Sequence, residues 1–245
     1  MNIFEQAAGR LMVALDCPTV EQARQLIDTL EGIPCYMKVG MQLYYSEGPD
    51  FVRELKDRGY SVFLDLKMHD IPNTVKNGAF GITSLGVDMF NVHAAGGLKM
   101  MKAAKEGVQE AMAASPALKQ PILIGVTQLT STDQTMLNQE LGIPGTVEQS
   151  VVSYALLTKE AGLDGVVASP LEVQAIKSAC SKDFKTVTPG IRPAGSAAGD
   201  QSRTLTPLEA MQQGTDYIVV GRPIISAPSP REAALQIIEE MKQAW

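Results

Sequence analysis

The chain has 245 residues, of which 45% are hydrophobic and 20% charged, with a formal net charge of −6 and a pI near 5.0. This composition is typical of a globular protein with a substantial core and excludes a disordered chain. The acidic balance disfavours a nucleic-acid-binding surface, which is normally a basic stripe or patch. The first apolar run is too short for a signal peptide or a membrane span, so we expect a cytoplasmic protein that does not contact membranes.

Short apolar runs alternate with amphipathic segments along the whole chain. Apolar runs predict strands, and side chains that recur on one face at helical spacing predict helices. Strands are predicted at residues 10–16, 35–40, 61–66, 88–92, 121–126, 165–168, 186–188 and 217–220. Helices are predicted at residues 19–30, 42–58, 73–85, 98–114, 146–161, 171–180, 207–213 and 231–243.

This alternation predicts the fold class. Continuous apolar strands, each followed by an amphipathic helix, indicate a parallel sheet that is buried on both faces. Eight such units fill a chain whose length suits a one-domain α/β barrel of about 200–250 residues. We therefore predict a single (β/α)₈ TIM barrel over residues 1–245, because no linker divides the chain. A doubly wound open sheet is the alternative, since the alternation alone does not separate the two.

Two long loops are predicted, over residues 130–145 and 192–203. Loops of this length are uncommon in compact domains and often act as lids. In a barrel the first loop follows the fifth strand and the second follows the seventh. Both would then lie on the face where barrel enzymes place their active sites.

Three charged residues gather at the end of the third strand, where residues 63–74 read FLDLKMHDIPNT. Side chains alternate along a strand, so Asp65 and Lys67 should point to the same side, with Asp70 beyond them in the loop. A surface ion pair of little energetic value is the alternative interpretation. We favour a functional site because Asp65 lies within an apolar run, where a charged group needs partners. Strand ends of this kind are catalytic in barrels.

Two further charged residues belong to the first two strands. Asp16 ends the first strand, and Lys38 lies inside the second. A buried strand lysine needs a carboxylate nearby, which Asp65 on the adjacent strand can supply. An alternating row of Lys38, Asp65, Lys67 and Asp70 would satisfy each of its members.

Two glycine-arginine segments close the last two strands, with TPGIR at residues 188–192 and VVGRPI at residues 219–224. Many barrels hold phosphate in the loops after strands seven and eight, through glycine N–H groups and a helix N-terminus. Arg222 and Arg192 would add bidentate, charge-assisted hydrogen bonds. Simple turns are the alternative, but the position after strand eight favours phosphate binding.

The histidines and cysteines are predicted to be structural. A metal site would join His93 to Asp16 and Asp65, but neighbouring lysines neutralise those carboxylates and the sequence has no close pair of histidines. The cysteines at positions 17, 35 and 180 have no pairing pattern and are predicted to be reduced. A nucleophilic Cys17 is disfavoured because neither histidine is near it in sequence.

Together these segments resemble the family of bacterial orotidine 5′-phosphate decarboxylases. Residues 65–74 are similar to the family's D-x-K-x-x-D signature and its H-D-I-P-N-T extension. Other family blocks are matched in the same order by LD at 15–16, MKVG at 37–40, QLTS at 128–131, TPGIR at 188–192 and VGRPI at 220–224. The resemblance extends from about residue 10 to the end of the chain.

The resemblance implies an enzyme that converts orotidine 5′-monophosphate to uridine 5′-monophosphate and carbon dioxide in de novo pyrimidine biosynthesis, with no metal or organic cofactor. It implies that Lys67 protonates C6 of the pyrimidine, between Asp65 and an Asp70 from the second subunit of a homodimer, with Lys38 completing the catalytic group. The implied substrate-binding residues are Asp16, Lys38 and Asp65, Thr74 from the partner subunit, Thr130 and Ser131 at the pyrimidine, Pro189 against the base, and Arg192, Gln201, Gly221 and Arg222 at the phosphate.

Two other functions remain open. Magnesium-dependent relatives, the ketogulonate-phosphate decarboxylases and hexulose-phosphate synthases, share the D-x-K-x-x-D strand but typically carry an acidic residue where this chain has Lys38. A non-catalytic barrel that binds a phosphorylated ligand would keep the glycine-arginine segments. The intact Lys67 and its two flanking aspartates disfavour that function.

Overall fold

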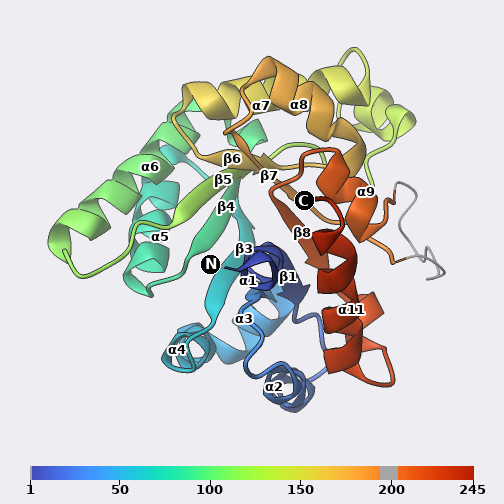
Figure 1. The fold of residues 1–245 in the computed structure, drawn as a ribbon. Helices are drawn as coiled ribbons and strands as arrows, with labels where there is room; N and C mark the ends of the chain where they lie inside the picture. The colour runs from blue at the N-terminus through green and yellow to red at the C-terminus, as the bar shows by residue number, and fades with distance from the viewer. Residues whose placement is uncertain (1, 194–203) are drawn as a thin grey trace.

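The protein is a closed parallel barrel of eight strands in the order β1 to β8, so the predicted (β/α)₈ TIM barrel is confirmed. A computed structural model describes residues 2–193 and 204–245. Figure 1 shows the strands in the middle of the molecule and the helices around them. The strands are β1 (Leu11–Ala14), β2 (Tyr36–Gly40), β3 (Ser61–Met68), β4 (Met89–His93), β5 (Ile122–Val126), β6 (Gly165–Val167), β7 (Lys185–Thr188) and β8 (Tyr217–Val220).

Helices connect the strands and cover the outside of the barrel (Figure 1). They are α1 (Ile3–Ala8), α2 (Val20–Thr29), α3 (Met41–Glu47), α4 (Pro49–Asp57), α5 (Pro72–Ser84), α6 (Gly97–Ala114), α7 (Val147–Glu160), α8 (Val173–Ala179), α9 (Pro207–Gln212), α10 (Arg222–Ile225) and α11 (Pro230–Lys242). Three short turns are η1 (Ala94–Gly96), η2 (Met136–Glu140) and η3 (Pro170–Glu172). Within the described residues, no helix has both the length and the apolar character needed to cross a bilayer.

Side chains fill the interior of the barrel. Met12, Phe63, Ile124 and Val187 come from the alternate strands β1, β3, β5 and β7, and they cluster with Met89 of β4. None of the five is more than 1% exposed. A layer built from alternate strands is the usual packing of this fold, and it leaves no channel through the barrel. A ligand must therefore bind at one of the two ends.

The single helix predicted over residues 42–58 was wrong, because two helices occupy this stretch. They meet at Gly48, whose φ of +69° lies in the left-handed region that favours glycine. Pro49 begins α4, where its missing N–H has no consequence, since the first N–H groups of a helix have no partner within it.

The helix α1 was not predicted, although its sequence carries a start signal. The Asn2 side chain accepts a hydrogen bond from the N–H of Glu5 at 2.8 Å, and Glu5 Oε2 accepts one from the N–H of Asn2 at 3.0 Å. This reciprocal pair is a capping box, which satisfies two N–H groups at the helix start. The helix packs against α11 beside the first strand.

The strand β3 is longer than predicted and irregular where it faces β4. Leu64 pairs with Phe90 and Met68 pairs with Val92, so residues 65–67 of β3 lie opposite Asn91 alone. Extra residues on one strand form a bulge, which redirects side chains and is common beside active sites. This bulge contains the charged residues singled out from the sequence.

The two predicted long loops are described to different extents. The first contains η2, a π-helical turn, and is therefore more ordered than predicted. Of the second, residues 192 and 193 are described, and residues 194–203 lie outside the described part of the chain.

Candidate active site

Four charged side chains form a row at the carboxyl-terminal ends of the strands, which we call the mouth of the barrel. Lys67 Nζ donates a hydrogen bond to Asp65 Oδ1 at 2.7 Å. Lys38 Nζ lies 3.5 Å from Asp65 Oδ2 and 3.1 Å from Asp16 Oδ1. The charges therefore alternate from Lys67 to Asp16, and the structure brings Lys38, Asp65 and Lys67 together as expected.

Asp65 is the buried centre of this row, with a side chain that is 13% exposed. Burial alone raises the pKa of Asp65, but the charges of Lys38 and Lys67 and the hydrogen bonds from Lys67 and Asn91 lower it by more. The pKa of Asp65 thus lies below its ordinary value. Asp65 is therefore ionised at neutral pH and forms ion pairs with both neighbouring lysines.

Lys67 has an unusual backbone conformation. Its φ is +52°, and it is the one residue other than glycine with a positive φ in the described part of the chain. This region is unfavourable for a residue with a side chain, and such strain is concentrated at functional sites. The bulge in β3 produces this conformation, so simple strand alternation does not explain why Lys67 meets Asp65.

Asn91 joins the backbone of Lys67 to the side chain of Asp65, and it was not predicted as a site residue. Its Oδ1 accepts a hydrogen bond from the N–H of Lys67 at 2.8 Å, and its Nδ2 donates one to Asp65 Oδ1 at 2.7 Å. The residue is 1% exposed. A sequence signal existed, because an amide in the apolar strand MFNVH needs buried hydrogen-bond partners.

Two glycines give the Asp16 end of the row its space. A Cβ atom on Gly40 would lie 3.3 Å from both Asp16 Oδ1 and Lys38 Nζ. A Cβ atom on Gly221 would lie 3.9 Å from Asp16 Oδ2. The row therefore runs from Lys67 to the Gly221-Arg222 segment that the sequence predicts to bind phosphate.

Asp70 is not part of the row within one chain. Its side chain is exposed, and its Oδ1 accepts a hydrogen bond from the N–H of Ile71 at 2.6 Å. No ion pair joins Asp70 to Lys67 among residues 2–193 and 204–245. Thr74, in the first turn of α5, is exposed as well.

The other predicted substrate-binding residues follow strands at the mouth. Thr130 and Ser131 follow β5, Pro189 and Arg192 follow β7, and Arg222 begins α10 directly after β8. The N–H of Arg192 donates to the carbonyl of Leu205 at 3.0 Å, which fixes the start of the second long loop. Gln201 lies outside the described residues.

The two histidines pack against each other beside Lys67, although they are far apart in sequence. The ring centroids of His69 and His93 are 5.5 Å apart. Burial lowers the pKa of His93, the positive fields of His69 and Lys67 lower it further, and Asp65 opposes them. In the part of the chain that the structure describes, no three or more His, Cys, Asp or Glu side chains form a group able to hold a metal ion. A reaction without metal or cofactor remains a prediction.

The three cysteines are free and buried. Burial raises the pKa of each thiol, to about 12 for Cys35. In Cys17 the neighbouring Asp16 raises the pKa further. A thiol with a raised pKa is a poor nucleophile, which agrees with the predicted structural role.

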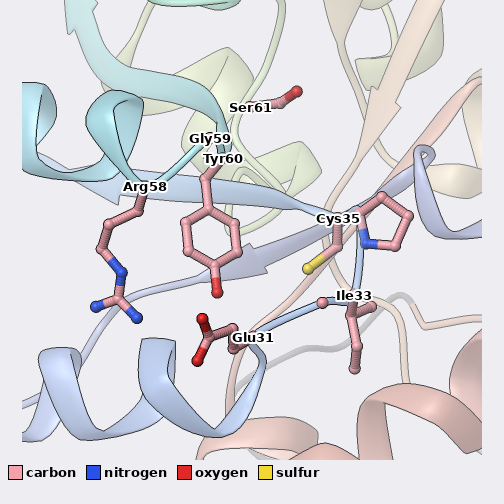
Figure 2. Close-up of a pocket in the computed structure, with 9 residues that line it drawn as sticks. Glu31, Ile33, Cys35, Arg58, Gly59, Tyr60 and Ser61 are labelled. Carbon is pink, nitrogen blue, oxygen red and sulfur yellow. The ribbon is translucent and has the colours of Figure 1, made fainter.

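A pocket of about 340 Å³ lies at the opposite end of the barrel, where β2 and β3 begin (Figure 2). Two of its polar side chains have partners within the chain: Tyr60 donates to the carbonyl of Ile27 at 3.0 Å, and Arg58 lies 2.8 Å from Asp28. None of the predicted site residues lines this pocket. The chemistry therefore points to the mouth, as the fold does.

Comparison with known proteins identifies relatives that cover almost the whole chain. A family model described as Orotidine 5′-phosphate decarboxylase / HUMPS family matches residues 9–237. The chain is 51% identical, over 235 residues, to an orotidine 5′-phosphate decarboxylase from Bacillus mycoides (strain KBAB4), with 96% of each protein covered.

Solved structures agree with this assignment. The crystal structure of orotidine 5′-phosphate decarboxylase from Lactobacillus acidophilus has a TM-score of 0.84 and 41% identity, with 94% of this chain and 98% of that chain covered. The enzyme of the same name from Pyrococcus horikoshii OT3 has a TM-score of 0.74 and 27% identity, with 95% and 99% covered. The predictions of the family and of a carboxy-lyase are confirmed. This chain belongs to the orotidine 5′-phosphate decarboxylase / HUMPS family.

Proposed function

We propose that the chain decarboxylates orotidine 5′-monophosphate to uridine 5′-monophosphate without a cofactor, as a step of de novo pyrimidine biosynthesis. The observation that carries this proposal is the row of alternating charges from Lys67 to Asp16, which ends beside Gly221. The row matches the order of the substrate's parts. The reacting ring would lie at Lys67, the ribose at Lys38 and Asp16, and the phosphate at Gly221.

Lys67 would stabilise the transition state and then donate a proton. The bond between C6 and the carboxylate breaks, carbon dioxide leaves, and the electron pair stays on C6. The pyrimidine delocalises this charge poorly, so a preorganised ammonium provides the main stabilisation. The proton then moves from Lys67 Nζ to C6, and the neutral amine takes a proton from solvent.

Asp65 and Lys38 prepare the ammonium for this role. The Asp65 carboxylate, 2.7 Å from Lys67 Nζ, holds the ammonium in place through a charge-assisted hydrogen bond before the substrate binds. Lys38 Nζ lies 3.5 Å from the second oxygen of Asp65 and forms an ion pair with it. A fixed arrangement of this kind needs little reorganisation during the reaction, which is the source of its catalytic effect.

The remaining residues would hold the substrate at its two ends. Thr130 and Ser131 contact the pyrimidine, and Pro189 lies against the base. Arg192, Gln201, Gly221 and Arg222 bind the phosphate. Binding energy from this remote, non-reacting group can organise the charges around the ring and so raise the rate.

A homodimer would complete the site. Asp70 and Thr74 are exposed at the mouth, and Ile71 between them is 67% exposed. We propose that each subunit supplies Asp70 and Thr74 to its partner's substrate, within a one-domain cytoplasmic enzyme. An apolar side chain flanked by polar ones suits a contact with a second protein surface.

The replacement Lys67→Ala tests this function in an absorbance assay of orotidine 5′-monophosphate. We expect activity to fall at least about 10⁴-fold, because both charge stabilisation and proton transfer are lost. Undiminished activity in this variant would remove Lys67 from the mechanism. If wild-type activity vanished in EDTA and returned with magnesium, the magnesium-dependent relatives would be the better model, whereas an inactive wild type that binds the nucleotide would indicate the non-catalytic barrel.

A further inference from the structure

The amide of Asn91 is the one neutral side chain that contacts both the backbone of Lys67 and the side chain of Asp65 among the described residues. We propose that Asn91 is a positioning residue, which holds the Lys67 ammonium toward the reacting carbon and keeps the Asp65 carboxylate between the two lysines. This inference rests on the proposed function, and it adds a residue from β4 to the charged row that comes from β2, β3 and the residue Asp16 after β1.

Asn91 supports the unusual backbone of Lys67. The bulge between Leu64 and Met68 removes Lys67 from the regular ladder between β3 and β4, so its N–H needs another acceptor. Asn91 Oδ1 supplies that acceptor at 2.8 Å, opposite the bulge. Because φ at Lys67 is +52°, an unfavourable conformation must be held by its surroundings. The hydrogen bond from Asn91 is one such restraint.

Asn91 also contacts one of the two carboxylate oxygens of Asp65. Oδ1 accepts from Lys67 Nζ and from Asn91 Nδ2, each at 2.7 Å, whereas Oδ2 faces Lys38 at 3.5 Å. The amide therefore fixes which oxygen meets Lys67. Since an amide does not titrate, it does so at every pH at which the protein is folded.

The burial of Asn91 also supports a role in the site. It is 1% exposed within an apolar strand, where an amide has a cost unless both of its polar groups are satisfied. The carbonyl oxygen of the Asn91 side chain is satisfied by the N–H of Lys67, and its amino group is satisfied by the carboxylate of Asp65.

Two variants separate the two contacts. Asn91→Ala removes both, and Asn91→Asp keeps an acceptor for the Lys67 N–H but replaces the donor to Asp65 with a second carboxylate of the same shape. Thr186→Val is the matched control, because Thr186 is a fully buried strand residue whose hydroxyl bonds Asp216 at 3.2 Å at the other end of the barrel. It should lose stability as the Asn91 variants do, but not catalysis.

We expect kcat to fall about 100-fold in both Asn91 variants with KM little changed. A displaced ammonium stabilises the transition state less but leaves substrate binding almost unchanged. A decrease of at least 10-fold, absent from Thr186→Val at matched folded concentration, supports the inference. A smaller decrease, or an equal one in the control, overturns it. Asn91→Asp keeps the test decisive if Asn91→Ala does not fold.

The second measurement does not depend on turnover. The Asp65 carboxyl can be titrated by carbon-13 NMR in the free protein, where it faces Lys38 from β2, Lys67 from its own strand and the His93 imidazole from β4. We expect its pKa to rise in Asn91→Ala and to stay in place in Thr186→Val. An unchanged pKa in Asn91→Ala would overturn the inference. If the wild type fails to decarboxylate the nucleotide, the proposed function fails, and this titration still tests the role of Asn91.

Discussion

Both ends of the barrel carry paired lysines and aspartates, but the pairs are built differently. At the amino-terminal ends of the strands, which we call the floor, Lys56 lies 2.5 Å from Asp88, and Lys177 lies 2.6 Å from Asp216. At the mouth, Asp65 lies between two lysines. A lysine near an aspartate is therefore no indication of function by itself, and the remaining partners of the carboxylate distinguish the two ends.

The aspartates at the floor accept hydrogen bonds from backbone N–H groups of neighbouring strands. Asp88, Asp164 and Asp216 each precede an even-numbered strand, and each follows a glycine by two residues. Their carboxylates accept the N–H groups of Val62, Leu123 and Thr186 in the preceding strand at 2.8, 2.8 and 2.7 Å. This repeated contact joins neighbouring strands at their amino-terminal ends.

The carboxylate of Asp65 at the mouth differs from those of the floor aspartates in its hydrogen-bond donors. Among residues 2–193 and 204–245, the hydrogen-bond donors to Asp65 are all side chains, and the neighbouring Lys67 is held in a strained conformation. Charges that neither cap the backbone nor lie freely in solvent are costly for stability, and they are retained where chemistry needs them. The comparison therefore predicts that substitutions at the mouth reduce activity and that substitutions at the floor reduce stability.

After Lys67→Ala, the largest effect at the mouth is expected for Asp65→Asn. Loss of this carboxylate removes the ion-pair partner of Lys67 and leaves Lys38 with Asp16 alone, so the Lys67 ammonium is no longer held in position. We expect kcat to fall at least about 10²- to 10³-fold, as for the loss of one preorganised electrostatic group. Steady-state kinetics measure this change, and a decrease below 10-fold would contradict the assignment of the mouth.

At the floor, Asp216→Ala should have the opposite outcome. It leaves the buried N–H of Thr186 and the ammonium of Lys177 without their shared acceptor. We expect the free energy of unfolding to fall by about 1–3 kcal/mol, with kcat of the folded enzyme unchanged. Denaturant unfolding and kinetics on the same preparation measure both quantities. A reduced kcat in the folded fraction would break the comparison.

The pH dependence of stability sharpens the comparison at the mouth. Because the pKa of Asp65 is lower in the folded protein than its ordinary value, its contribution to stability is present above about pH 4 and is lost as the pH falls through the folded pKa. The difference in free energy of unfolding between the wild type and Asp65→Asn should therefore shrink below about pH 4. A difference that stays constant from pH 7 to pH 3 would show that the pKa of Asp65 is not lowered by folding.

The smallest effect is expected for Gly40→Ala. The added Cβ would lie 3.3 Å from Asp16 Oδ1 and Lys38 Nζ, so both side chains must shift by a few tenths of an ångström. We expect KM to rise about 5-fold, which corresponds to about 1 kcal/mol of lost binding. Gly9→Ala is the control at the floor, where the new Cβ would lie 3.2 Å from the carbonyl of Glu5. That variant should affect stability alone, and an equal change of KM would contradict the placement of the ribose.

Local sequence patterns predicted much of this molecule. Apolar runs located all eight strands to within a few residues, because a strand buried on both faces must be apolar along its length. The position of charged residues at strand ends predicted a row of Lys38, Asp65, Lys67 and Asp70, whereas within one chain Asp16 occupies the end of the row and Asp70 lies outside it. The predicted helix over residues 42–58 was wrong because the pattern of apolar residues continues across the break at Gly48.

The sequence by itself determined where the strands lie along the chain and which charged residues stand at their ends, since both follow from local composition. Only the tertiary structure decided between a closed barrel and an open sheet, because the pairing of β1 with β8 joins segments that are far apart along the chain. The tertiary structure also placed His69 against His93, and it placed Asn91 opposite the bulge that contains Lys67. Register and bulges depend on how two strands fit together, and neither strand carries that information alone.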